Sequence, residues 1–270
     1  MPPDTLTVAL VRDVFPAEAD HERLKRRLGE AAALGAQLAV LPELPFNPWS
    51  AVSTTPRDED AEPPPPDGPR YRRLVEAVAE TGIAVLGGAI VRDTVSGRRL
   101  NTALLVDASG RLVGRYSKIH LPEEPGYWET SHYEAGTTAP EPLILPGTSL
   151  RLGIQICSDI NRPAGAQLLA ARGAEVIIIP RATEAHSYPR WLLVFRAVAL
   201  TNGAWVVSVN RPDDPSVPIG GPSVVVDPTG QIVLETEDTV VAATLDRSSV
   251  ASARASYPGY LSMREPWMPS

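Results

Sequence analysis

The stretch RLGIQICSDINRPAGAQLLAARGAEVIIIP, residues 151–180, contains a complete strand, loop, helix and strand. The apolar runs 151–157 and 175–180 have the length and composition of buried strands, whereas residues 163–174 begin at a proline and repeat alanine and leucine at helical spacing. Strands that alternate with helices are typical of an α/β fold. The loop region also holds Cys157, the only cysteine of the chain.

The same alternation continues on both sides of this stretch. Apolar runs typical of strands occur at 5–11, 37–43, 83–91 and 205–210, and apolar residues repeat at helical spacing at 20–36, 71–82 and 191–204. The segments 101–118 and 223–236 each read as two strands around a turn, Asp-Ala-Ser-Gly or Asp-Pro-Thr-Gly. We therefore expect an α/β fold with a mixed sheet, or with two sheets back to back and helices outside. Because no internal repeat or linker divides the chain, residues 1–270 are expected to form a single domain.

Composition and charge narrow the range of partners. Of 270 residues, 43% are hydrophobic, and 32 acidic residues against 25 Lys and Arg give a net charge of −7. No basic run follows a phosphate backbone, which argues against nucleic acid as a partner. The N-terminus lacks a signal-peptide pattern and no segment reaches the roughly 18 apolar residues that span a bilayer, so we expect a soluble, cytoplasmic protein without membrane contact. One cysteine and four scattered histidines predict no metal site, and no cofactor motif occurs.

Three ionisable residues stand where apolar strands are expected to end. Glu43 ends 37–43, Lys118 ends the hairpin 101–118, and Cys157 ends 151–157. Reactive groups gather at the carboxyl ends of strands in open α/β folds. Taken singly, each has an ordinary explanation, since a lone cysteine is most often a small buried apolar residue and a lone Glu or Lys a solvated charge. Together, a carboxylate, an ammonium and a thiol can perform covalent acyl transfer as base, oxyanion stabiliser and nucleophile.

Three separated motifs occur in a fixed order along the chain. They are LAVLPELPFNPW (38–49), GRYSKIHLPEEPGYWETSHYEAG (114–136) and LGIQICSDINRPAGAQLLAARGAEVIIIP (152–180). In residues and in order they resemble the nitrilase superfamily of carbon-nitrogen hydrolases, and the resemblance extends from about residue 5 to about residue 250. It implies a four-layer α-β-β-α sandwich.

Carried over by position, the resemblance implies roles for four side chains. Glu43 would be the general base, Lys118 the oxyanion stabiliser and Cys157 the nucleophile. The family's second glutamate is assigned to Glu129, seven residues before Gly136. The other glutamates of this motif are better explained as solvated loop residues.

The implied reaction is hydrolysis of a small amide or N-carbamoyl compound without a cofactor. Glu43 takes the Cys157 proton, the thiolate attacks the carbonyl carbon, and Lys118 and the backbone N–H of Ser158 hold the oxyanion. The amine departs and leaves a thioester or carbamoyl-enzyme, which water hydrolyses, while Glu129 positions Lys118 and the substrate. Family members usually pair into homo-oligomers through helices and C-terminal tails, and the tail from about residue 250 contains aromatics and prolines suited to packing on a neighbour.

The residues after the cysteine favour an amide or N-carbamoyl substrate over a nitrile. True nitrilases usually have Trp-Glu there, whereas this chain has Ser158 and Asp159. The segment 120–136 is similar to that of N-carbamoylputrescine amidohydrolases, and Asp159 is shared with N-carbamoyl-D-amino acid amidohydrolases. The latter enzymes have paired arginines next, where this chain has Ile160 and Asn161. The chemical identity of the substrate's leaving group is therefore left open.

Further residues are candidates for substrate binding. Arg181 could hold a substrate carboxylate with its guanidinium fork, and Glu184 could contact an amine. An ion pair of Arg181 with Glu184 or Asp159 explains it equally well. Phe46 and Trp49 could form an apolar pocket wall, or they could be ordinary core aromatics.

Other classes of function fit these residues less well. The chain has no G-x-S-x-G elbow of a serine hydrolase and no G-x-G-x-x-G after its first strand. Nitrile hydrolysis and acyl transfer to an amine remain alternatives on the same catalytic site. A non-catalytic binding scaffold would be expected to have lost part of the Glu, Lys and Cys set, and all three are present.

Overall fold

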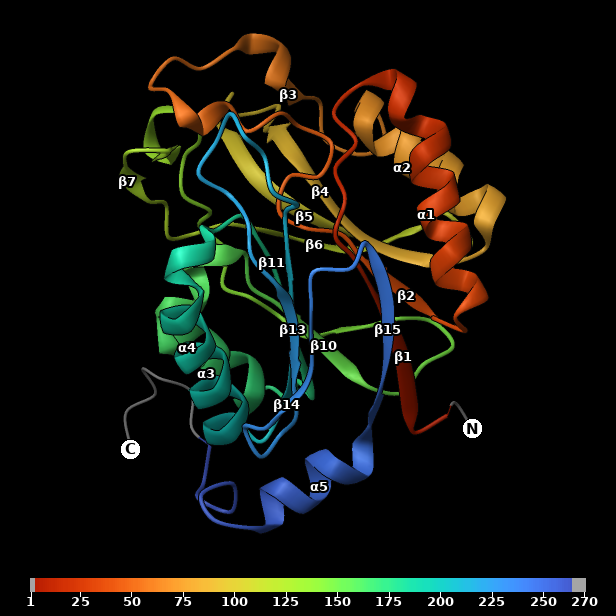
Figure 1. Cartoon of the computed structure of the whole chain (residues 1–270), viewed down its shortest axis with the longest axis vertical. Helices are drawn as coiled ribbons and strands as arrows, with labels where there is room; N and C mark the ends of the chain where they lie inside the picture. The colour runs from red at the N-terminus through yellow and green to blue at the C-terminus, as the bar shows by residue number, and fades with distance from the viewer. Residues whose placement is uncertain (1–2, 264–270) are drawn as a thin grey trace.

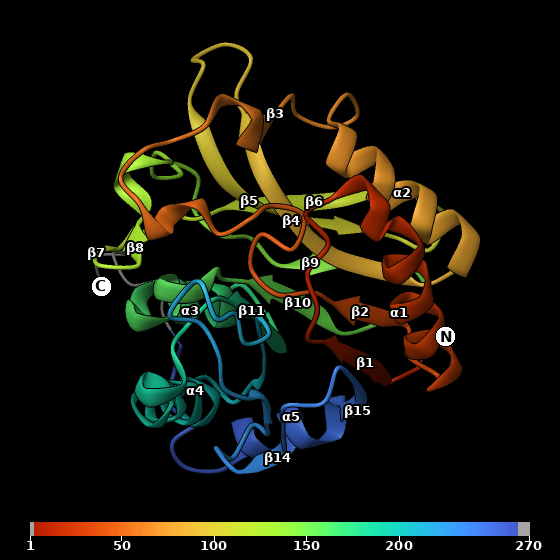
Figure 2. The same ribbon diagram turned by 45° about the horizontal axis from the view of Figure 1, so that its top comes forward.

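The computed structural model describes residues 3–263 and contains two β-sheets packed face to face, with helices on both outer faces (Figures 1 and 2). This confirms the expected α-β-β-α sandwich. The two hairpins and the strand and helix alternation predicted from the sequence are all present, with ends that differ by a few residues.

The first sheet has the strand order β15-β1-β2-β4-β5-β6, with the short β3 beside β4. Its strands are β1 (Thr5–Val11), β2 (Leu38–Val40), β3 (Ala61–Glu62), β4 (Ala84–Arg92), β5 (Arg99–Val106), β6 (Leu112–Ser117) and β15 (Val240–Asp246). Because β1, β2 and β4 run parallel, their carboxyl ends meet at one edge, and Glu43 follows β2 there.

The second sheet has the order β14-β13-β12-β11-β10-β9. Its strands are β9 (Leu143–Ile144), β10 (Arg151–Ile154), β11 (Val176–Arg181), β12 (Trp205–Asn210), β13 (Ser223–Val226) and β14 (Ile232–Thr236). The parallel strands β10, β11 and β12 also end at a common edge, and Cys157 lies just beyond β10.

Helices α1 and α2 cover the outer face of the first sheet, and α3 and α4 cover that of the second (Figures 1 and 2). The helices are α1 (His21–Ala33), α2 (Pro69–Thr81), α3 (Pro163–Ala171), α4 (Tyr188–Asn202) and α5 (Arg247–Ala255). One-turn helices are η1 (Glu18–Asp20), η2 (Ser50–Val52), η3 (Asp58–Asp60), η4 (Glu129–Ser131), η5 (Cys157–Asn161) and η6 (Ala185–Ser187), and β7 (Glu123–Glu124) pairs with β8 (Tyr127–Trp128). None of the helices within residues 3–263 is both long enough and apolar enough to cross a membrane.

Three apolar layers hold the sandwich together. Along β1, Leu6, Val8 and Leu10 face the core between the sheets, whereas Ala9 and Val11 face the layer under α1 and α2. This period-2 alternation is what a strand buried on both faces produces. A third layer lies between the second sheet and α3 and α4.

The strands before the candidate catalytic residues end earlier than the sequence predicts. β2 ends at Val40, because Pro42 has no N–H for the ladder, and β10 ends at Ile154. Cys157 begins η5 with a positive φ of 47°, which turns the chain away from the sheet. The prediction that Glu43 and Cys157 terminate strands is therefore wrong by three residues in each case. Of the expected C-terminal tail, residues 264–270 lie outside the described residues.

Candidate active site

Glu43, Lys118 and Glu129 meet in one buried cluster. The Lys118 Nζ lies 2.8 Å from Glu43 Oε1 and 2.7 and 2.8 Å from the two oxygens of Glu129. They come from three separate segments, the loop after β2, the residue after β6, and η4. All three side chains are fully buried. The structure thus brings together three of the four side chains to which the sequence analysis gave catalytic roles.

Cys157 lies at the same edge, on the second sheet's side of the cluster. The residue is 3% exposed, and its Sγ lies 3.8 Å from the Ala182 carbonyl oxygen. Burial raises the pKa of Cys157 well above its usual value, and the negative charge of Glu43 adds to this, while Lys118 opposes it. The resting thiol is therefore protonated, so the reaction requires a base to remove its proton.

One oxygen of Glu43 is available for that proton. Oε1 accepts hydrogen bonds from Lys118 and, at 2.8 Å, from Asn101 Nδ2. Oε2 is buried and has no hydrogen-bond partner among the described residues. A buried acceptor without a donor is rare and costly, which indicates that a reacting group completes this site. Asn101 lies in β5 and belongs to no motif, so the sequence gave no signal for it.

The two glutamates fix the charge of Lys118. Burial alone would lower the pKa of this ammonium, but Glu129 and Glu43 raise it well above its usual value. Burial raises the pKa of Glu129 to about 8; Lys118 lowers it and Glu43 raises it further. Lys118 is therefore a permanent cation, placed to stabilise an oxyanion that develops beside it.

Asp159 ties the cysteine loop to the lysine loop. Its carboxylate accepts hydrogen bonds from the backbone N–H groups of Ile119 at 3.2 Å and His120 at 2.9 Å, and also from the N–H of Ile156 at 3.2 Å. The Ser158 hydroxyl donates to the His120 carbonyl oxygen. The side chain of Ser158 is thus engaged with protein, and its proposed contribution rests on its backbone N–H alone.

The structure does not support Phe46 as part of a substrate pocket. It is 1% exposed and packs with Phe15 and the inner faces of α1 and α2, on the helix side of the first sheet. Trp49 instead joins a second apolar cluster near the reactive groups. That cluster comprises Leu44, Trp49, Ala51, Ile90, Tyr127, Tyr133, Ala182 and Ile219.

The interpretation of Arg181 as a substrate fork is also corrected. The guanidinium is fully buried and donates to the side chains of Ser208 and Thr183 and to the Pro222 carbonyl oxygen. It lies over the rings of Tyr188 and Phe195 in α4, in the layer behind the second sheet. No carboxylate of the described chain pairs with it, so the alternative of an ion pair with Glu184 or Asp159 is wrong as well.

Glu184 occupies a more open position. Its side chain is about a quarter exposed and pairs with His186 Nε2 at 3.1 Å. Burial raises the pKa of the Tyr127 phenol, and the negative charge of Glu184 is near enough to raise it further. The role of Glu184 as an amine contact stays a prediction.

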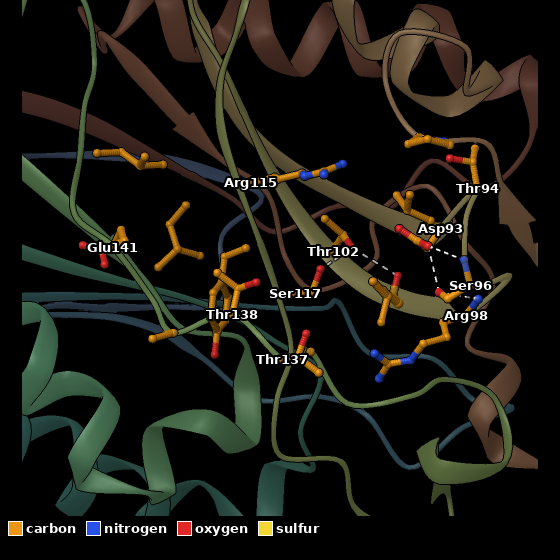
Figure 3. Close-up of a pocket in the computed structure, with 18 residues that line it drawn as sticks. Asp93, Thr94, Ser96, Arg98, Thr102, Arg115, Ser117, Thr137, Thr138 and Glu141 are labelled. Carbon is orange, nitrogen blue, oxygen red and sulfur yellow. Dashed lines mark hydrogen bonds between the residues drawn. The ribbon is translucent and has the colours of Figure 1, made fainter. Parts of the chain in front are cut away.

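A groove of about 600 Å³ opens elsewhere, beside β5 and β6 (Figure 3). Thr102 and Ser117, whose hydroxyls are 3.0 Å apart, are among its lining residues, together with Arg98 and Arg115. No residue of the catalytic cluster lines it. A separate small cavity of about 10 Å³ lies next to Glu43 and Asn101. The side chains of Glu43, Lys118 and Glu129 are fully buried, which excludes water and strengthens the electrostatic interactions among them. Within residues 3–263, no group of three or more His, Cys, Asp or Glu side chains is arranged to hold a metal ion.

Comparisons with known proteins point to one family. The carbon-nitrogen hydrolase family matches residues 12–255. Omega-amidase NIT2 of Xenopus tropicalis is 30% identical over 253 residues, 91% of this chain and 90% of that protein. A hydrolase of Schizosaccharomyces pombe is 32% identical over 87% of this chain and 74% of its own length. The crystal structure of Saccharomyces cerevisiae Nit3, a member of branch 10 of the nitrilase superfamily, has the same fold, with a TM-score of 0.80, 24% identity, and coverage of 95% of this chain and 96% of that one. The chain therefore belongs to the carbon-nitrogen hydrolase family of the nitrilase superfamily.

Proposed function

We propose that this chain hydrolyses the carbon–nitrogen bond of a small amide through a thioester on Cys157. The observation that carries the proposal is the buried Glu43, Lys118 and Glu129 cluster, in which Glu43 Oε2 has no partner among the described residues. An unoccupied basic oxygen and a fixed cation near a protonated thiol are the parts that cysteine-dependent acyl transfer needs. The amidase relatives support the same reaction.

The reaction begins with the thiol proton. Glu43 Oε2 takes it as Sγ forms a bond to the carbonyl carbon of the substrate, and the carbonyl oxygen becomes an oxyanion held by Lys118 and the N–H of Ser158. Glu43 then gives its proton to the nitrogen, the C–N bond breaks, and ammonia or an amine leaves. Glu43 then takes a proton from water as the water oxygen bonds to the thioester carbonyl carbon, and it returns this proton to Sγ as the C–S bond breaks, which releases the acid and restores the thiol.

The surroundings of the cluster favour an uncharged acyl group. Leu44, Trp49, Tyr127 and Tyr133 supply apolar and aromatic surface beside Glu43 and Cys157. The buried guanidinium of Arg181 already donates to oxygen atoms of Thr183, Ser208 and Pro222. Its N–H groups are therefore engaged with protein and not directed to a substrate carboxylate. We therefore place short apolar amides before N-carbamoyl amino acids as substrates.

Ammonia release from a substrate panel tests the proposal. The panel contains primary amides with and without a carboxylate, N-carbamoyl amines, N-carbamoyl amino acids and nitriles, each with the wild type and with Cys157→Ala. We expect release from apolar primary amides, with none from the variant. Release from N-carbamoyl compounds or nitriles alone would replace the amide assignment. If hydroxylamine is added, a hydroxamate formed in place of the acid would show only that an amine can resolve the thioester. The product formed in the absence of hydroxylamine therefore decides between a hydrolase and a transferase.

A further inference from the structure

We infer that Arg211 is a positioning residue that holds the general-base loop of the first sheet against the sheet that carries Cys157. The inference rests on the proposed role of Glu43 as base. The structure shows Arg211 reaching between the two sheets, and nothing in the sequence motifs points to it.

The contacts of Arg211 join the two halves of the site. Arg211 follows β12, and its backbone N–H donates to the Arg181 carbonyl oxygen at 3.1 Å, which extends the pairing of β12 with β11. Its Nη1 donates to the carbonyl oxygens of Glu43 at 3.1 Å and Leu44 at 2.8 Å, and its Nη2 to that of Asn47 at 3.3 Å. One planar side chain thus binds three carbonyl oxygens of the loop that carries the base.

The base loop has a conformation that needs such support. Leu44, directly after the base, has a positive φ of 47°, which is strained for a residue with a side chain. Strain of this kind persists only where surrounding contacts determine the backbone. The carbonyl oxygens of Glu43 and Leu44, which lie before and after the strained Leu44 Cα, both accept from the Arg211 guanidinium, so this contact fixes the direction in which the Glu43 side chain leaves the backbone.

Arg211 is a buried cation whose hydrogen bonds go to neutral carbonyl oxygens. It is 5% exposed, its guanidinium lies 5.6 Å from the centre of the Trp49 ring, and no carboxylate of the described residues forms an ion pair with it. A buried cation without an ion-pair partner is costly, and burial lowers the pKa of Arg211 to about 10 even though the charge of Glu43 opposes this. The cation and the Glu43 carboxylate are thus close enough to interact. Arg211 therefore acts on the base by orienting its loop.

Arg12 provides a matched control. It is also a buried arginine, 8% exposed, and donates to the backbone carbonyl oxygens of Gly221 and Glu237. It contacts neither Glu43 nor Cys157, and its carboxylate partner is the exposed Asp213. Loss of Arg12 should therefore cost stability without changing the behaviour of the base.

The test compares Arg211→Gln, Arg211→Lys and Arg12→Gln with the wild type. For each, the thermal midpoint, kcat, KM and the rate of Cys157 alkylation by iodoacetamide are measured against pH. We expect Arg211→Gln to lower kcat about 100-fold with little change in KM, as a misplaced catalytic group does. Its alkylation should also be slower, because the misplaced base no longer removes the Cys157 proton efficiently. Arg211→Lys should recover part of both effects.

Two results would overturn the inference. The first is that the folded Arg211→Gln variant has the kcat and the alkylation profile of the wild type. If Arg211→Gln does not fold, the same result for Arg211→Lys would overturn the inference. The second is an equal change of the alkylation profile in Arg12→Gln. Alkylation needs no substrate, so it distinguishes failure of this inference from failure of the proposed amide hydrolysis.

Discussion

Lys118 is a fully buried ammonium between two glutamates, and this arrangement makes it sensitive to replacement. Lys118→Met would leave the buried side chains of Glu43 and Glu129 without the cation to which they are hydrogen-bonded. We expect the free energy of unfolding to fall by about 3–5 kcal/mol, as for other broken buried pairs. We also expect kcat to fall by about 10²–10³, the usual cost of losing an oxyanion contact. Denaturant unfolding and steady-state kinetics measure the two effects, and a kcat within a few-fold of the wild type would show that Lys118 serves structure only.

Glu129 gives the stability of the protein a pH dependence. Burial raises the pKa of Glu129 to about 8 from its ordinary value of 4.5. Between these values the folded chain retains a proton that the unfolded chain has lost, so stability falls as the pH rises from about 4.5 to about 8. Glu129→Gln removes this titration, and its thermal midpoint should change less over the same range. Equal slopes for the two proteins in scans from pH 5 to pH 8 would contradict this.

At the scale of elements, η5 depends on Asp159. The carboxylate accepts hydrogen bonds from three backbone N–H groups. One belongs to Ile156, directly before η5, and the other two belong to Ile119 and His120, directly after Lys118. Asp159→Asn exchanges one acceptor oxygen for an N–H₂ group that faces donors. At about 1–3 kcal/mol for each unsatisfied donor, we expect a loss of about 2–6 kcal/mol in unfolding free energy and a lower kcat.

Ser158→Ala is the control for this element. It removes one hydrogen bond, from the Ser158 hydroxyl to His120, at the same junction. Its cost should be about 1 kcal/mol, with little change in kcat. If Asp159→Asn and Ser158→Ala are equally mild, then Asp159 does not hold the cysteine and lysine loops together.

The sequence predicts the features that depend on burial, and it does not predict the features that depend on backbone angles or on contacts between distant segments. Alternating and helical apolar patterns report burial, so most strands and helices could be predicted, and the motifs located the Glu43, Lys118 and Glu129 cluster. Strand ends depend on backbone angles, such as φ at Cys157, which no local pattern revealed. Asn101 reaches the base from β5 of the same sheet, and Arg211 reaches it from the end of β12 in the other sheet, so these contacts depend on how the strands pair and how the sheets stack.

At the scale of the whole molecule, we propose that two copies pair through α4 and the segment after α5. Leu193 in α4 is 69% exposed, and Tyr257 and Tyr260 after α5 are 76% and 62% exposed. Helix α4 covers the outer face of the second sheet (Figure 1). Contact with another copy would cover these exposed side chains.

Light scattering coupled to gel filtration tests this pairing. The wild type should elute with the mass of a dimer or a larger oligomer, and the double variant Leu193→Glu, Tyr260→Glu should have a lower mass at the same concentration. A monomeric wild type would contradict the proposal. An oligomer that the double variant leaves intact would place the interface on another surface.

The proposed reaction depends on a bond between the substrate carbonyl carbon and Sγ of Cys157. The most direct test is the intact mass of the enzyme, quenched with acid during turnover of a primary amide, followed by peptide mapping. We predict an added mass equal to the acyl group on the peptide that contains Cys157 in the wild type, and neither adduct nor turnover in Cys157→Ala. Ammonia release by a folded Cys157→Ala variant would contradict the account.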